Sequence, residues 1–149
     1  MNITFCGHRS IPDRNLISNK LNIELKTLFE KNTHLTFYCG GYGEFDSLVS
    51  TCIDSLRKIY PKVSCEKIFV TPYITESYRE RNAIMKKLYD DVLYPPLENV
   101  PYRLAILRRN EWMVDNSDLL IACVLYSWGG AAQTLEYAQR KKKSIINLV

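Results

Sequence analysis

The sequence has few of the residues that build disulfide frameworks or metal centres, and it has no long apolar run. Its five cysteines are odd in number and form no Cys-x-x-Cys pair, which argues against a disulfide framework. Histidine is limited to His8 and His34, so we expect no metal site, and no pattern indicates a cofactor. No apolar stretch approaches the roughly 18 residues that span a bilayer, and the N-terminus lacks the pattern of a secretory signal. We therefore expect a cytoplasmic protein with no membrane partner.

The chain also lacks a strong excess of charge of one sign. Its formal net charge is +4, and the basic run from Arg140 to Lys143 closes a predicted helix, where cations complement the helix dipole. Proteins that bind nucleic acid usually present a broader basic face, and no stripe mixes basic with aromatic residues along this sequence. The sequence therefore argues against nucleic acid as a partner.

Apolar, strand-like runs alternate along the chain with segments of helical periodicity. This alternation is typical of an α/β fold in which helices flank a Rossmann-like, doubly wound and mainly parallel sheet. At 149 residues the chain has the length of a single domain, which we assign to residues 1–149. We expect strands at residues 3–6, 35–39, 66–71, 118–125 and 144–149, and helices at residues 13–31, 46–60, 102–116 and 131–142.

Residues 72–103 interrupt this alternation. They hold four prolines and a charged helical stretch at residues 76–91. A surface connection is the default expectation for such a segment, and a lid or a cover for the edge of the sheet are the alternatives.

Three of the predicted strands run directly into glycine turns, which are Gly7-His8-Arg9, Gly40-Gly41-Tyr42-Gly43 and Trp128-Gly129-Gly130. Right-handed crossovers and the usual strand order place these strands side by side. Their carboxyl ends then meet at the topological switch point, where open α/β sheets bind ligands. Because glycine exposes backbone N–H groups that suit an anion, the sequence predicts one crevice that holds an anionic ligand.

The third turn leads into a predicted helix and is the most informative of the three. Backbone N–H groups from Gly129 to Ala131 can bind a phosphate, and Gln133 and Thr134 add polar side chains. A Gly-Gly pair is equally typical of a tight junction between a strand and a helix. Trp128 either stacks on a base or sugar or packs at the edge of the crevice.

Charged and polar residues near the other turns are also candidates for the site, and each is weighed against a structural role. Arg109 interrupts an apolar helical stripe, so it either extends its head to solvent or pairs with a carboxylate or a phosphate. Arg9 suits phosphate recognition, and His8 fits a hydrogen-bonding role in a loop better than a catalytic role. Asp46 fits a helix N-cap better than a catalytic role.

These motifs resemble the SLOG superfamily, which unites LOG-type (lysine decarboxylase-like) phosphoribohydrolases with DprA/Smf and YpsA-like proteins. The segment Arg109-Asn110-Glu111-Trp112-Met113 is similar to the LOG pattern Arg-Lys-x-x-Met, and residues 128–136 fall on the LOG segment Pro-Gly-Gly-x-Gly-Thr-x-x-Glu. The resemblance implies that Arg109 and Glu136 occupy the positions of the LOG catalytic pair. In LOG enzymes this pair acts on the N-glycosidic bond of a nucleoside monophosphate.

The chain is most similar to the YpsA-like branch, through Gly7-His8-Arg9 and the run from Gly40 to Asp46. This resemblance implies a protein that binds a nucleotide, a nucleotide sugar or a related ligand at the three turns. A LOG-like N-glycosidase is the alternative, so any enzymatic activity would be that of a hydrolase, and a DprA-like role on DNA is a weaker third hypothesis. Departures from the LOG pattern, at Trp128 and Gln133 among others, argue against hydrolysis more than against binding. Analogy with LOG-type relatives further suggests a homodimer.

Overall fold

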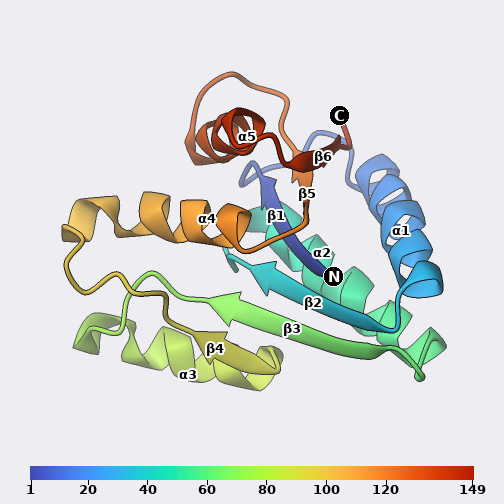
Figure 1. The fold of residues 1–149 in the computed structure, drawn as a ribbon, viewed down its shortest axis with the longest axis horizontal. Coiled ribbons are helices and arrows are strands. Elements are labelled where there is room, and N and C mark those ends of the chain that lie inside the picture. The colour runs from blue at the N-terminus through green and yellow to red at the C-terminus, as the bar shows by residue number, and fades with distance from the viewer.

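The computed structural model describes residues 1–149 as a six-stranded parallel sheet with helices on both faces (Figure 1). The strands are β1 (Asn2–Gly7), β2 (His34–Cys39), β3 (Ser64–Val70), β4 (Asp91–Leu93), β5 (Leu119–Cys123) and β6 (Ser144–Asn147). The helices are α1 (Arg14–Lys31), α2 (Gly43–Ile59), α3 (Arg79–Leu88), α4 (Ala105–Asp115) and α5 (Gly130–Arg140), with short 3₁₀ turns at Glu76–Tyr78 and Tyr102–Leu104. The strand order is β4-β3-β2-β1-β5-β6, so the expected α/β class and the adjacency of β2, β1 and β5 are confirmed.

Alternating side chains along the strands form a separate core on each face of the sheet. Phe5, Phe37 and Ile121 belong to the larger core, beneath α1 and α2. Leu120 and Ala122 point the other way and pack beneath α4 and α5. Figure 1 shows these two pairs of helices on opposite sides of the sheet. Because all six strands are parallel, their carboxyl ends lie together at one edge of the sheet.

Helix α1 illustrates how the sequence sets the position of an element. The carboxylate of Asp13 accepts a hydrogen bond from the Leu16 N–H at 3.1 Å, which caps the first turn. The buried face repeats at every fourth residue, through Ile17, Leu21, Leu25 and Phe29. Lys31 in the last turn complements the negative end of the helix dipole.

Residues 72–103 extend the sheet, which the sequence pattern did not predict. The expected helix at residues 76–91 divides into a 3₁₀ turn and α3, and the chain then pairs β4 with β3 in parallel. A strand of three residues is too short to show an alternating pattern, and prolines at positions 95 and 96 follow it after one residue. The segment therefore supplies the edge strand next to β3.

Two further structural facts bear on the expectations from composition. No helix combines the length and the apolar character that crossing a bilayer requires. All five cysteines are free thiols, and no group of three or more acidic, cysteine or histidine side chains is arranged to hold a metal ion. A cytoplasmic location stays a prediction.

Candidate functional site

A crevice of about 510 Å³ lies at the carboxyl ends of β1, β2 and β5. It occupies the switch point of the sheet, since the chain continues from β1 to β2 on one side and places β5 on the other. Its volume is in the range of typical small-molecule sites. All three glycine turns contribute to its lining, through Gly7, His8, Arg9, Gly40, Tyr42, Trp128, Gly129 and Gly130.

The structure brings most of the predicted site residues to this crevice and leaves a few outside. Asp46, Arg109, Ala131 and Thr134 also line it. Four predicted residues, Gly41, Gly43, Gln133 and Glu136, are not part of the lining. Gln133 and Glu136 lie on the exposed face of α5, whereas Thr134 and Ala138 form its buried face. The catalytic role of Glu136 therefore stays a prediction.

Sequence reasoning did not select Tyr42, Tyr78 or Asn110, which also line the crevice. Tyr42 stands inside the second glycine turn, so its position next to the glycines could have indicated it. The hydroxyls of Tyr42 and Tyr78 are 2.8 Å apart, although the residues are 36 positions apart in the sequence. Nothing in the sequence around Tyr78 indicates that contact.

The turn between β2 and α2 is closed by the chain itself. The Tyr42 N–H donates to the Asp46 carboxylate at 2.8 Å, and the Glu44 N–H donates to the Arg9 carbonyl at 2.8 Å. Gly43 has a φ of +91°, and a Cβ there would lie 2.9 Å from the Cα of Arg9. The first and second turns are therefore packed against each other, and the N–H groups of Tyr42 and Glu44 are already bonded.

The turn between β5 and α5 is open. Gly129 has a φ of +93° and a ψ of 174°, a region that essentially only glycine adopts. A Cβ at Gly129 or Gly130 would meet no other atom within 4 Å. No side chain caps α5, and the N–H groups of Gly130 and Ala131 have no acceptor within the chain. This helix therefore presents free donors and the positive end of its dipole to the crevice.

Arg109 is a buried cation with no carboxylate partner. Its side chain reaches across the ends of β2 and β3, and only 2% of the residue is exposed. Nη1 donates to the carbonyls of Gly40 at 3.2 Å and Val70 at 2.7 Å, and Nε donates to the Asn110 side chain at 2.9 Å. Nη2 makes no hydrogen bond, and no acidic group lies within 4 Å of the guanidinium. Burial lowers the pKa of Arg109, but a guanidinium stays charged in proteins.

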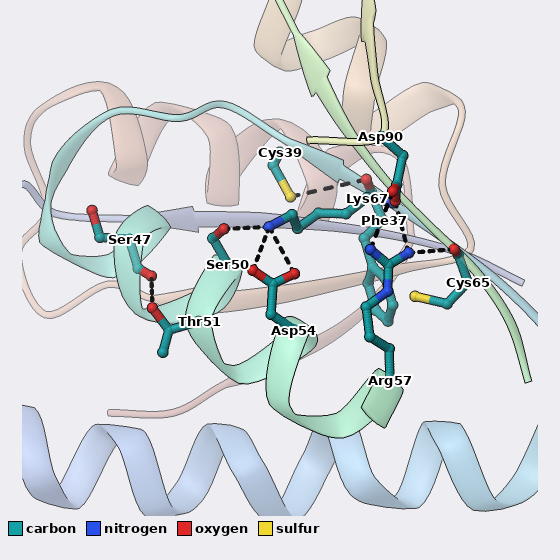
Figure 2. A network of polar contacts seen from close by, with 10 residues as sticks. All are labelled: Phe37, Cys39, Ser47, Ser50, Thr51, Asp54, Arg57, Cys65, Lys67 and Asp90. Atoms are coloured by element: carbon teal, nitrogen blue, oxygen red, sulfur yellow. Dashed lines mark hydrogen bonds and ion pairs between the residues drawn. The ribbon is translucent and has the colours of Figure 1, made fainter. Parts of the chain in front are cut away.

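Lys67 on β3 shows what a fully compensated buried cation looks like in the same protein (Figure 2). It is 1% exposed, and its ammonium donates to Ser50 at 2.7 Å and to both carboxylate oxygens of Asp54 at 2.9 and 3.0 Å. These acceptors use all of its donors, and they join β3 to α2. Arg109 differs because its neighbouring acceptors are neutral and one of its nitrogens remains free.

Asp46 is a second ionisable group in the crevice, and its carboxyl interacts with the charge of Arg109. Burial raises the pKa of its carboxyl to about 6, while the Tyr42 N–H and the Arg109 charge act in the opposite direction. The crevice therefore loses a negative charge as the pH falls through about 6.

A row of aromatic rings extends from the crevice on the side of the open turn. His8 Nε2 accepts the N–H groups of Leu125 at 3.0 Å and Tyr126 at 3.1 Å, so a neutral His8 carries its proton on Nδ1. The Tyr126 ring lies 4.9 Å from the His8 ring and 4.7 Å from the Trp128 ring. Trp128 ends the row and is 68% exposed.

A second aromatic group lies on the other side of the crevice. Tyr73 packs between Tyr78, at 4.6 Å, and Tyr102, at 4.2 Å. The Arg81 guanidinium lies 4.2 Å above the Tyr42 ring and donates to the Gly41 carbonyl at 2.8 Å. Aromatic and basic side chains from separate segments thus surround one site.

No family model and no curated protein sequence matches the chain. Its fold is similar to that of DNA processing protein A from Helicobacter pylori, whose structure describes a single-stranded DNA binding mode. The match has a TM-score of 0.64 and 16% sequence identity, and it covers 97% of this chain and 63% of that chain. The chain therefore spans less than two thirds of that protein, and at this identity the likeness shows a shared fold.

This comparison corrects the expectation about partners. The sequence argued against nucleic acid, and that expectation is wrong, because the chain shares its fold with a protein that binds single-stranded DNA. The physical reason is that no contiguous stripe of basic and aromatic residues exists along the sequence, whereas folding gathers such residues around the crevice from distant segments. What the chain shares with a DprA protein is its fold, and both the SLOG superfamily and its YpsA-like branch stay predictions.

Proposed function

We propose that the crevice binds the phosphate of a nucleotide unit. The observation that supports this most strongly is the buried Arg109, which has no carboxylate partner in the chain. A buried charge is costly unless an opposite charge or a full set of hydrogen bonds compensates it. Asp46 interacts with Arg109 over a distance greater than 4 Å, so a phosphate in the crevice would be the first anion in direct contact with the guanidinium. The open N-terminus of α5 and Arg9 at the edge of the crevice favour the same anion.

The size and lining of the crevice favour a nucleotide over a bare phosphate. Its volume of about 510 Å³ exceeds what one phosphate occupies, and Tyr42, Tyr78, Ile106 and Met113 form much of the remaining lining. These side chains offer apolar and aromatic surface to a ribose or a base. The nucleotide is either a free molecule or one unit of a single strand, and both sources present the same chemistry to Arg109.

A strand as the source of the nucleotide is the second candidate, and the fold shared with a single-stranded DNA-binding protein supports it. The LOG-like hydrolase finds no such support in the crevice, because Glu136 is exposed and does not line it. We therefore propose binding and no reaction.

Binding measured by calorimetry for AMP and by fluorescence anisotropy for a labelled oligo-dT tests this proposal. We expect Arg109→Gln to weaken both on the order of 100-fold, because it removes charge-assisted hydrogen bonds to the phosphate. Arg108→Gln is the matched control, since Arg108 is the exposed neighbour on α4 and pairs with Glu111. Equal affinities for the two variants, in protein with unchanged circular dichroism, would contradict the proposal.

Gly130→Asp tests the same site without disturbing the core. No atom lies within 4 Å of a Cβ at this position, so the fold accepts the side chain while its charge repels a phosphate. Gly130→Asn is the neutral control, because its side chain has the same shape as that of aspartate. We expect it to bind AMP and oligo-dT at least tenfold more tightly than Gly130→Asp does. Oligo-dT that binds at least tenfold more tightly than AMP identifies a strand as the source, and the reverse order identifies a free nucleotide.

A further inference from the structure

We propose that Trp128 and Tyr126 form a stacking site for a nucleobase of a single-stranded nucleic acid. The base belongs to a nucleotide adjacent to the one whose phosphate occupies the crevice, so the inference rests on the proposed function. The ligand is therefore a strand of at least two nucleotides.

The geometry of the two rings supports this inference. Their centroids are 4.7 Å apart and their planes differ by 19°, so one face of the indole rests on Tyr126. With 68% of the residue exposed, the remaining face of the indole is open to solvent. An exposed indole face is the surface on which a nucleobase stacks in proteins that bind single strands.

The loop that carries these rings is fixed before any ligand binds. His8 holds the N–H groups of Leu125 and Tyr126, and the Val124 N–H donates to the Asn147 side chain at 3.2 Å. Large exposed aromatic residues usually lose conformational freedom on binding, and a preformed loop reduces that loss. The rings are therefore already stacked in the orientation that a base requires.

The position of Trp128 identifies the ligand as a nucleic acid. Trp128 directly precedes Gly129, the N-cap residue of α5, so a single residue separates the stacking ring from the free N–H group of Gly130. Alternating aromatic and phosphate-binding positions are the typical pattern of single-strand recognition. Tyr102 is also exposed, at the end of the aromatic group on the opposite side of the crevice, which leaves stacking surface where the strand continues.

Tryptophan fluorescence tests the stacking directly. The chain has two tryptophans, so Trp128 is the only one left in a Trp112→Phe background. Trp112 packs against Tyr38, so its replacement leaves the open turn unchanged. We expect an oligo-dT of about 12 nucleotides to quench the emission, and an abasic strand of equal length to leave it unchanged.

Affinity measurements then separate stacking from phosphate binding. We expect Trp128→Ala to weaken oligo-dT binding on the order of tenfold, to leave binding of the abasic strand unchanged, and Trp128→Phe to restore most of the loss. Ile59→Ala, at an exposed residue on the last turn of α2, is the control and should change neither.

Three outcomes would overturn the inference. If Trp128→Ala binds oligo-dT as tightly as the wild type while Arg109→Gln does not, the stacking site is wrong and the phosphate site stands. If Trp128→Ala weakens the abasic strand equally, Trp128 acts by supporting the loop and not by stacking. If neither Trp128→Ala nor Arg109→Gln changes binding, the proposed function fails as well.

Discussion

The N-termini of α2 and α5 face the same crevice, but the chain treats them differently. At α2, Arg9 and Asp46 accept N–H groups of the first turn, and Gly43 packs against the backbone of Arg9. At α5, the first N–H groups have no acceptor. A Cβ at either glycine of this turn would meet no atom within 4 Å beyond the adjacent residues and the backbone of the helix itself. Similar glycine-rich sequences therefore produce two different turns. The turn before α2 is packed and its N–H groups are bonded, whereas the turn before α5 has N–H groups that can bind a ligand.

The contrast separates two reasons for using glycine. A Cβ at Gly7 would overlap the ring of Phe45, and one at Gly41 would lie 2.6 Å from the ring of Phe69. These glycines are required by the fold whether or not a ligand binds. Gly130 has an ordinary backbone conformation and no close neighbour, so the fold gives no reason for it.

The largest expected effect tests this division directly. Gly7→Ala should lower the free energy of unfolding by about 3 kcal/mol, because Phe45 is fully buried and cannot move aside without disturbing the core. Gly130→Ala should change it by no more than about 0.5 kcal/mol. Urea denaturation of both variants gives the comparison, and equal losses would show that the two turns do not differ as described.

A second experiment compares the two glycines of the open turn. Gly129→Ala should cost about 2 kcal/mol, because the backbone conformation of Gly129 is strained for any side chain even though space is available. Thermal unfolding of Gly129→Ala and Gly130→Ala, side by side, measures the difference. A Gly129→Ala variant as stable as the wild type would mean that the turn readily adopts another conformation.

The pH dependence of stability and of ligand affinity should come from Asp46 in the turn before α2, because the backbone N–H groups of the turn before α5 do not titrate. The pKa of Asp46 is raised to about 6 from its ordinary value, so the fold favours the protonated form and loses stability as the pH rises through about 6. Ionised Asp46 also repels an anion near Arg109, so binding should be about fivefold stronger at pH 5 than at pH 7.

Oligo-dT without a terminal phosphate is the appropriate ligand for that measurement, since its phosphodiesters do not titrate in this range. Asp46→Asn keeps an oxygen that can accept the Tyr42 N–H, and it should bind equally well at both pH values. A pH dependence that persists in Asp46→Asn would assign the effect to another group.

The smallest effect concerns the loop next to the open turn. His8→Phe keeps a ring against Tyr126 but removes the acceptor of two N–H groups, which water can replace because Leu125 and Tyr126 are exposed. We expect a loss of about 0.5 to 1 kcal/mol and faster amide exchange at these two residues, while the Glu44 amide stays protected. Unchanged exchange at Leu125 and Tyr126 would show that His8 does not hold the loop.

The sequence predicted the strands and turns that form the site, because strand and turn patterns extend over only a few neighbouring residues. Apolar, strand-like runs marked five of the six strands, and right-handed crossovers then predicted β2, β1 and β5 as neighbours. Arg109 stood out as a charge within an apolar stripe, and it is buried at the crevice. The strand β4 was missed because three residues carry no periodic pattern.

The remaining features of the site depend on contacts between distant segments. Tyr78 reaches Tyr42 from the 3₁₀ turn before α3, and Arg81 reaches it from α3 itself. The loop that carries Tyr126 and Trp128 is held by His8, which is more than 100 positions away in the sequence. The exposed position of Glu136 follows from the rotation of α5 about its axis, which its packing on the sheet decides.

By itself the sequence determined the α/β fold and the meeting of three glycine turns at one edge of the sheet, because strand and turn propensities act over a few residues. Tertiary structure alone decided that the turn before α2 is filled by Arg9 and Asp46 while the turn before α5 stays open. It also decided that Arg109 is buried with no carboxylate within 4 Å, whereas Lys67 is paired with Asp54. Burial and partners depend on which segments pack together, and that information is spread over the whole chain.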